Sequence, residues 1–132
     1  MATDGPVQQA RSQGGWVKAM VDVNPQSEQI VRCFNSQLAG SAASTPPCGF
    51  VLQEPTAGTT IVDFGFQVND RFLSVFPYAA GSNGHIIANL GFCGGSPTVF
   101  CNSPFPTPNQ AEITTFDGDG NAQNTEFYLV VF

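Results

Sequence analysis

Apolar and polar residues alternate with a period of two along much of this 132-residue chain. The clearest alternation lies within residues 60–77, where every second position is apolar and faces one side of a strand: Val62, Phe64, Phe66 and Val68. Asn69 and Asp70 follow, and both side chains can hydrogen-bond the backbone of a turn. A second apolar run covers residues 72–76. The pattern predicts a β-hairpin here, with its apolar face in the core.

The same alternation predicts strands in six further segments: residues 16–23, 28–38, 48–53, 85–93, 111–116 and 124–132. The first two are joined by a turn that contains Pro25 and predict another hairpin. No long window shows the 3.6-residue period of a helix. The fold class expected is all-β: an antiparallel, jelly-roll-like β-sandwich of about eight to ten strands, with almost no helix. We interpret residues 15–132 as one such domain and the polar residues 1–14 as a flexible leader.

The last predicted strand is apolar on both faces. Its alternate residues form two sets: Phe127, Leu129 and Val131 on one face, and Tyr128, Val130 and Phe132 on the other. A strand of a two-layer sandwich has only one inner face, so the second face needs another cover. Trp16 and Met20 also point away from the core in the first strand. We expect a second copy of the chain to supply the cover, with the proline-rich loop 94–110 as the alternative.

Composition narrows the classes of partner. Apolar residues make up 42% of the chain and charged residues 11%, and the net charge is −6. Binding of nucleic acid depends on neutralising phosphates, so an acidic chain with few cations argues against that partner and against an anionic membrane surface. No apolar run is long enough to span a bilayer. A surface of Ser, Thr, Asn, Gln and Gly is typical of secreted, appendage-associated and sugar-binding β proteins.

The N-terminus lacks a basic start followed by an apolar run, so no signal peptide is expected. An extracellular location, or one on a surface or appendage, is nevertheless the expected one. Three explanations stay open: the protein is not exported by the signal-peptide route, a signal was removed and a Met added, or the protein is released by lysis.

Four cysteines allow three disulfide connectivities. Their positions favour two local pairs, Cys33–Cys48 and Cys93–Cys101, which are 15 and 8 residues apart. Buried free thiols are the alternative. Zinc is a poor third interpretation, because there is no C-x-x-C pair and His85 is the sole histidine.

Two stretches resemble a known family. Residues 58–75, GTTIVDFGFQVNDRFLSV, look like the G-x-Y-x-(V/F)-x-F-x-(V/F) strand of the C1q/TNF-like heads, although Thr60 replaces an aromatic residue. The C-terminal EFYLVVF is similar to the strand that those heads place near a three-fold axis. The resemblance implies a ten-strand jelly-roll trimer used for recognition, and it transfers no binding residue.

Residues 117–121, Asp-Gly-Asp-Gly-Asn, resemble the start of a calcium-binding loop, with weak candidate ligands at Asp117, Asp119 and Asn121. Ala122 stands where that loop has Gly, and Tyr128 where it has its last Glu. A β-turn explains the same residues more simply. We expect no cofactor, with a calcium-dependent binding module as an alternative.

Catalytic patterns are weak. His85 has no G-x-S-x-G serine elbow to work with. Four carboxylates could approach one another across strands, which leaves a small polysaccharide-acting hydrolase as an alternative: Asp63, Asp70, Glu112 and Glu126. We predict that the protein is not an enzyme.

The expected function is therefore recognition. Three exposed rings are candidates for stacking on a sugar or a protein: Trp16, Tyr78 and His85. Arg71, beside the turn of the central stretch, is a fourth ligand-binding candidate, and Arg32 is expected to pair with an acid such as Asp63. The sequence thus predicts a non-catalytic recognition or structural head, a homotrimer that binds a glycan as a lectin does, or a protein as a receptor-binding module does.

Overall fold

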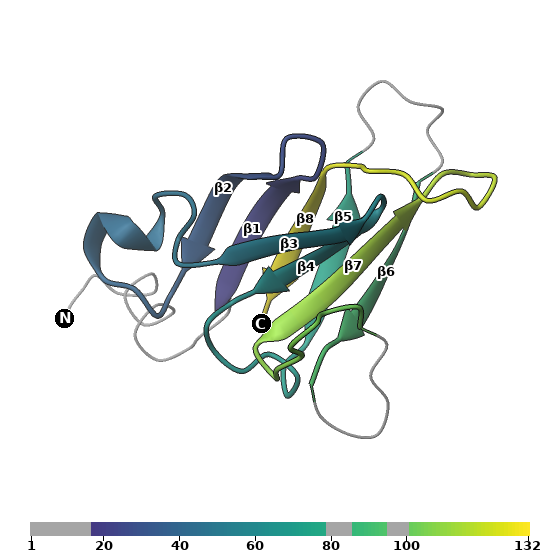
Figure 1. Ribbon diagram of the computed structural model, residues 1–132. Coiled ribbons are helices and arrows are strands. Elements are labelled where there is room, and N and C mark those ends of the chain that lie inside the picture. Colours follow the sequence, from purple (N-terminus) through teal and green to yellow (C-terminus); the bar gives the residue numbers. More distant parts are fainter. Residues whose placement is uncertain (1–16, 79–85, 95–100) are drawn as a thin grey trace.

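The computed structural model describes residues 17–78, 86–94 and 101–132 as two antiparallel four-stranded sheets packed face to face (Figure 1). The first sheet has the order β2 (Gln29–Asn35), β1 (Ala19–Asn24), β8 (Phe127–Val131), β5 (Leu73–Pro77). The second sheet has the order β3 (Val51–Thr56), β4 (Thr59–Asp63), β7 (Gln110–Phe116), β6 (Ile87–Phe92). Helix in the described residues is limited to the short 3-10 turn η1 (Gly40–Ala43). The leader, Trp16 and His85 lie outside these residues.

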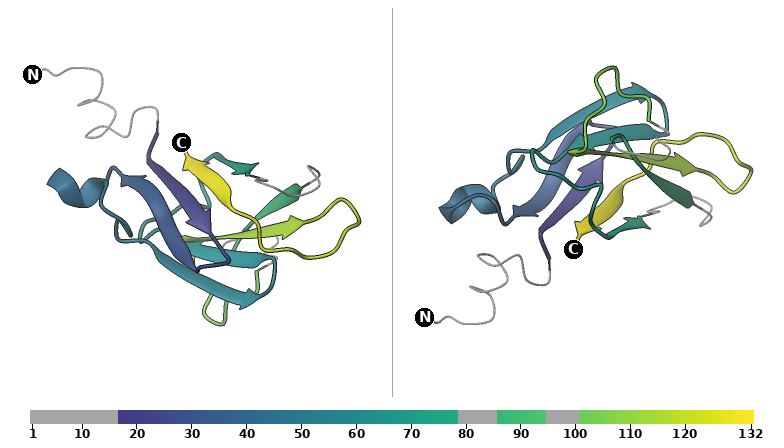
Figure 2. Two further views of the ribbon diagram at one scale, coloured as in Figure 1. Left: turned by 90° about the horizontal axis from the view of Figure 1, so that it is seen from above. Right: turned by 90° about the horizontal axis from the view of Figure 1, so that it is seen from below.

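The chain winds between the two sheets in a jelly-roll-like manner. It crosses from one sheet to the other between β2 and β3, β4 and β5, β5 and β6, and β7 and β8. The first and last strands, β1 and β8, lie side by side in both views of Figure 2. The predicted all-β antiparallel sandwich with almost no helix is therefore confirmed. Within the described residues, no helix is long and apolar enough to cross a membrane.

The prediction of a β-hairpin over residues 60–77 is wrong. β4 pairs with β3 and β7 in the second sheet, whereas β5 pairs with β8 in the first. The chain leaves β4 at Gly65, which has a φ of +76° and donates its N–H to the Asp63 carboxylate at 2.9 Å. The apolar face itself is as predicted, since Phe64 and Val68 are buried. They enter the core from the connection between the sheets.

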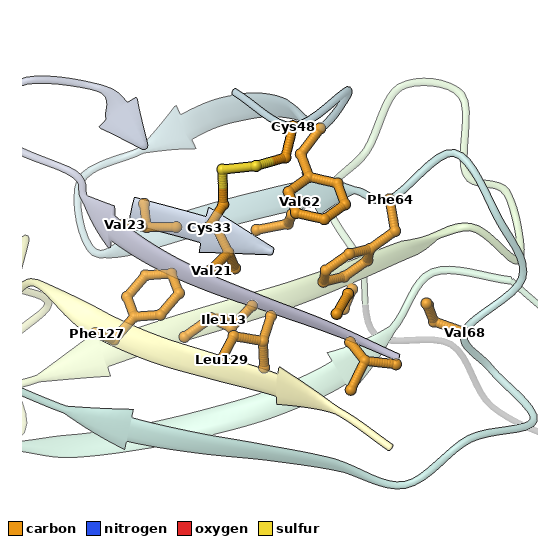
Figure 3. Packing of buried hydrophobic residues seen from close by; sticks show 14 residues of the cluster. Val21, Val23, Cys33, Cys48, Val62, Phe64, Val68, Ile113, Phe127 and Leu129 are labelled. Atoms are coloured by element: carbon orange, nitrogen blue, oxygen red, sulfur yellow. A yellow bond between two sulfur atoms is a disulfide. The ribbon is translucent and has the colours of Figure 1, made fainter. Parts of the chain in front are cut away.

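The core fills the space between the two sheets, and both contribute to it (Figure 3). Phe50 and Phe64 pack edge to face, with ring centroids 5.1 Å apart. As the alternation predicts, three residues of β8 point inward and are fully buried: Phe127, Leu129 and Val131. Their neighbours Tyr128, Val130 and Phe132 are only partly buried or exposed.

The first predicted hairpin is present as β1 and β2. Residues Ala19, Val21 and Val23 face the core and are buried, while Met20 is exposed on the other face. The register shifts between Asp22 and Val23, so that Asp22 pairs with Arg32 and Val23 with Ile30. This bulge leaves Val31 exposed and unpaired.

Both predicted disulfides are present. Cys33–Cys48 ties β2 to the segment after η1 and is part of the core (Figure 3). Cys93–Cys101 joins the end of β6 to the proline-rich loop. Disulfides persist in oxidising compartments, so two of them indicate an oxidising, extracellular type of environment.

The proline-rich loop does not cover β8 with the residues that are described, 101–109. The backbone N–H of Asn102 donates instead to the Glu112 carboxylate on β7 at 2.6 Å. Glu112 pairs with Ile61, and both residues are buried although they point away from the core. The loop thus lies on the second sheet, and its Phe105 stays exposed.

Candidate functional site

The candidate site is the outer face of the first sheet, the side turned away from the core. Cross-strand pairing places eight side chains there in two adjacent rows. One row is Phe34–Met20–Val130–Ser74, and the other is Arg32–Asp22–Tyr128–Phe76. We call these eight residues the outer face.

The outer face carries exposed apolar side chains. Met20 and Phe76 are exposed on it, and Tyr78 and Phe132 are exposed beside it. A shallow groove of about 280 Å³ runs over β2, β1 and β8 between six of the side chains: Met20, Asp22, Arg32, Phe34, Tyr128 and Val130. Large exposed apolar patches of this kind mark interaction sites more often than ordinary surface.

A polar cluster lies at the centre of the second row. The Asp22 side chain is 6% exposed, and its Oδ2 accepts hydrogen bonds from Arg32 Nε at 3.2 Å and Nη2 at 3.1 Å. Arg32 Nη2 also donates to the Tyr128 hydroxyl at 3.1 Å, and the guanidinium lies 5.7 Å from that ring's centroid. The pKa of Arg32 is raised. The hydrogen bond to Asp22 is the largest cause, and electrostatic interactions with Tyr128 and Asp22 come next. The Tyr78 and Tyr128 rings pack together, with centroids 5.9 Å apart.

Asp22 also interacts with Glu126, which comes two residues before Tyr128 on the same face of the chain. The other Asp22 oxygen, Oδ1, is buried and has no hydrogen-bond partner. The side-chain interaction with Asp22 is the largest cause that raises the pKa of Glu126 to about 7; burial and the Asp22 charge add to it, and the Arg32 charge opposes it. A protonated Glu126 carboxyl can supply the donor that Asp22 Oδ1 lacks. Glu126 is therefore the carboxyl group beside Asp22 that takes up a proton near neutral pH.

The structure does not bring the predicted ligand-binding residues together in one place. Tyr78 joins the polar cluster through Tyr128. Arg71 lies at the opposite end of β5, where Nη1 donates to the backbone oxygen of Phe132 at 3.3 Å and the guanidinium lies 6.0 Å from the Phe66 ring centroid. Trp16 and His85 fall outside the described residues.

Arg32 pairs with an acid, as predicted, but that acid is Asp22 and not the suggested Asp63. Asp63 belongs to the second sheet, where its carboxylate accepts from the backbone of Gly65 and from Gln110. Sequence reasoning overlooked Asp22 and its pairing with Glu126. The available signal was the short turn between the first two strands, which sets Asp22 opposite Arg32.

Two of the carboxylates proposed for a hydrolase interact with different partners in different parts of the structure. Glu112 binds the backbone and side chain of Asn102, and Glu126 interacts with Asp22. Glycosidases hold their two carboxyl groups roughly 5–9.5 Å apart to admit a sugar or a water. Glu112 lies on the second sheet and Glu126 beside the first, so these two carboxyl groups do not form such a pair.

The segment around Asp117 folds as a self-contained turn. Asp117 Oδ1 accepts from the backbone N–H groups of Asp119 and Asn121, both at 2.9 Å, and Gly120 has a φ of +87°. The bond from Asn121 is the largest cause that lowers the Asp117 pKa. No cluster of three or more metal-binding side chains occurs in the part of the chain described here.

Removal of divalent metal ions is expected to leave the thermal stability of the protein unchanged, because residues 117–121 form a turn that needs no ion. The Asp117 carboxylate already satisfies the turn's backbone donors, so the turn does not need a cation. Thermal unfolding in excess EDTA and in excess calcium should give the same Tm. A Tm several degrees higher in calcium would show a bound ion instead.

No protein-family model matches the chain, and it has no significant match among curated proteins or solved structures.

Proposed function

We propose that this protein is a non-catalytic recognition head whose copies associate through the outer face of the first sheet. The observation that carries the proposal is the outer face over β8, which is apolar except for Ser74, Asp22 and Arg32. The last strand buries Phe127, Leu129 and Val131 on one side and presents Tyr128, Val130 and Phe132 on the other. A second copy of the chain is the occupant that buries this surface.

Two further observations support a second copy as the occupant. Within residues 101–109, the loop that could have covered β8 binds Glu112 on the other sheet instead. In addition, β8 lies between β1 and β5, so its outer side chains stand in the middle of a broad face. Symmetric homo-oligomers are the commonest assemblies of such surfaces.

A trimer is the proposed form, by resemblance to the C1q/TNF-like heads. The jelly-roll-like winding and the central place of the C-terminal strand support that assignment. The proposed ligand is a glycan or a protein, bound outside the subunit interface. Arg71 with the exposed Phe72, at the end of the first sheet, is the favoured contact region. An extracellular, surface or appendage location fits the two disulfides.

Sedimentation of the wild-type chain at micromolar concentration is expected to show an oligomer. Val130→Lys should weaken association at least about 100-fold, because a lysine at the centre of an interface carries an uncompensated charge. Val51→Lys is the matched control: Val51 is exposed on the second sheet, and its substitution should leave the assembly intact. Both variants should keep the wild-type circular dichroism spectrum.

A wild-type chain that sediments as a monomer would contradict the assembly. Equal weakening by Val51→Lys would assign the interface to another surface. A glycan array then tests the ligand, and an array without hits would favour a protein ligand or a structural role.

A further inference from the structure

We propose that protonation of the Asp22–Glu126 pair strengthens the association of copies through the outer face, so that the assembly tightens in mild acid and loosens in mild alkali. This inference rests on the proposed function, because it assumes that the outer face is the subunit interface. It adds a chemical control to that interface.

The pair stands inside the surface that association would bury. Asp22 belongs to the second row of the outer face, between Arg32 and Tyr128. Its carboxylate is nearly inaccessible already in the single chain, and Oδ1 has no donor among the described residues. Glu126, which immediately precedes β8, interacts with it. A second copy that packs on the second row of the outer face therefore covers Asp22 and Glu126.

The charges that face the pair come from every neighbouring strand. β1 contributes Asp22 and β2 contributes Arg32. Glu126 immediately precedes β8, which contributes Tyr128, and Tyr78 follows β5. Arg32 is the cation bonded to the pair, and its side chain is 71% exposed. With Glu126 ionised, two carboxylates face one guanidinium, and the cluster carries a charge of −1. With Glu126 protonated, the cluster is neutral, and Asp22 Oδ1 gains its missing hydrogen bond.

Association buries this cluster under another copy, which carries the same net charge of −6. An ionised cluster then has to lose water against a negatively charged partner, and both effects oppose binding. The neutral cluster avoids both costs. The pKa of about 7 for Glu126 places this change near neutral pH. Burial by a partner raises the pKa further, because desolvation disfavours the charged form of a carboxyl group.

The sign follows from linkage. An associated state that raises the pKa of Glu126 binds more protons than the free copy does. Association is therefore strongest below the pKa of the free copy and weakens as pH rises through the pKa of the assembly. Each unit by which association raises the pKa is worth tenfold in the dissociation constant at high pH.

Sedimentation over a range from about pH 5.5 to about pH 8.5 tests the inference. We expect the wild-type dissociation constant to rise at least about tenfold over this range. Glu126→Gln imitates the protonated side chain and should associate tightly at both ends of it. Glu54→Gln is the matched control: burial and Glu28 raise the pKa of Glu54, which lies on β3, and its substitution should leave the pH dependence unchanged.

The outcomes separate the two proposals. An oligomer that is equally tight at all pH values would overturn the coupling and leave the assembly standing. A monomer at every pH would overturn both. A pH dependence that survives in Glu126→Gln would show that another group takes up the proton. Circular dichroism at each pH confirms that the compared samples are folded.

Discussion

Phe127→Ala is expected to lower the free energy of unfolding by about 3–5 kcal/mol. Phe127 is 1% exposed and packs in the core between the two sheets (Figure 3). Truncation removes its contacts and leaves a cavity that the rigid strands of a sandwich fill poorly. Urea unfolding in the Val130→Lys background, in which the chain should be monomeric, gives the value without a contribution from assembly.

Phe76→Ala in the same background is the matched control. Phe76 lies on the neighbouring strand β5 but points outward and is 54% exposed. Its loss should cost less than about 1 kcal/mol of monomer stability. In the wild-type background, the same substitution should weaken association. Equal unfolding costs for Phe127→Ala and Phe76→Ala would mean that the two faces of the sheet are assigned wrongly.

Removal of the Cys33–Cys48 disulfide is expected to have the second largest effect. The bridge closes a loop with a sequence separation of 15, which is worth about 3 kcal/mol in the loop-entropy treatment. Both half-cystines also pack in the core, so alanine at both positions loses packing in addition. Urea unfolding of the Cys33→Ala/Cys48→Ala double variant should show a loss above about 3 kcal/mol.

The second disulfide provides the comparison. Cys93–Cys101 has a sequence separation of 8, which the same treatment values at about 2.5 kcal/mol. Cys93→Ala/Cys101→Ala should therefore destabilise the chain less than removal of the first bridge. A larger loss for this second variant would show that the loop after β6 contributes more to stability than the core around Cys33 does.

Features set by neighbours in sequence could be predicted. Alternation identified the inward residues of β1 and β8, and a short turn predicted the β1–β2 hairpin. Both disulfides join cysteines that are close along the chain, so spacing alone favoured the right pairs. In each case the information lies within a few residues or one short loop.

Features set by distant neighbours could not be predicted. An apolar run after a turn signal is compatible with a hairpin and with a crossing to the other sheet. Residues 60–77 cross from one sheet to the other, because β4 pairs with β7 in the second sheet and β5 pairs with β8 in the first. The partner of Arg32 was missed for a related reason, since alternation alone does not specify which carboxylate of another strand lies opposite.

The sequence by itself determined that this is a β protein with two local disulfides and a C-terminal strand that is apolar on both faces, because alternation and spacing are local properties. Only the tertiary structure decided which strands pair across the two sheets, that the described part of the proline-rich loop lies on the second sheet, and that Asp22 meets Glu126 beside Arg32. These contacts join segments far apart in the chain, and strand pairing is what brings them together.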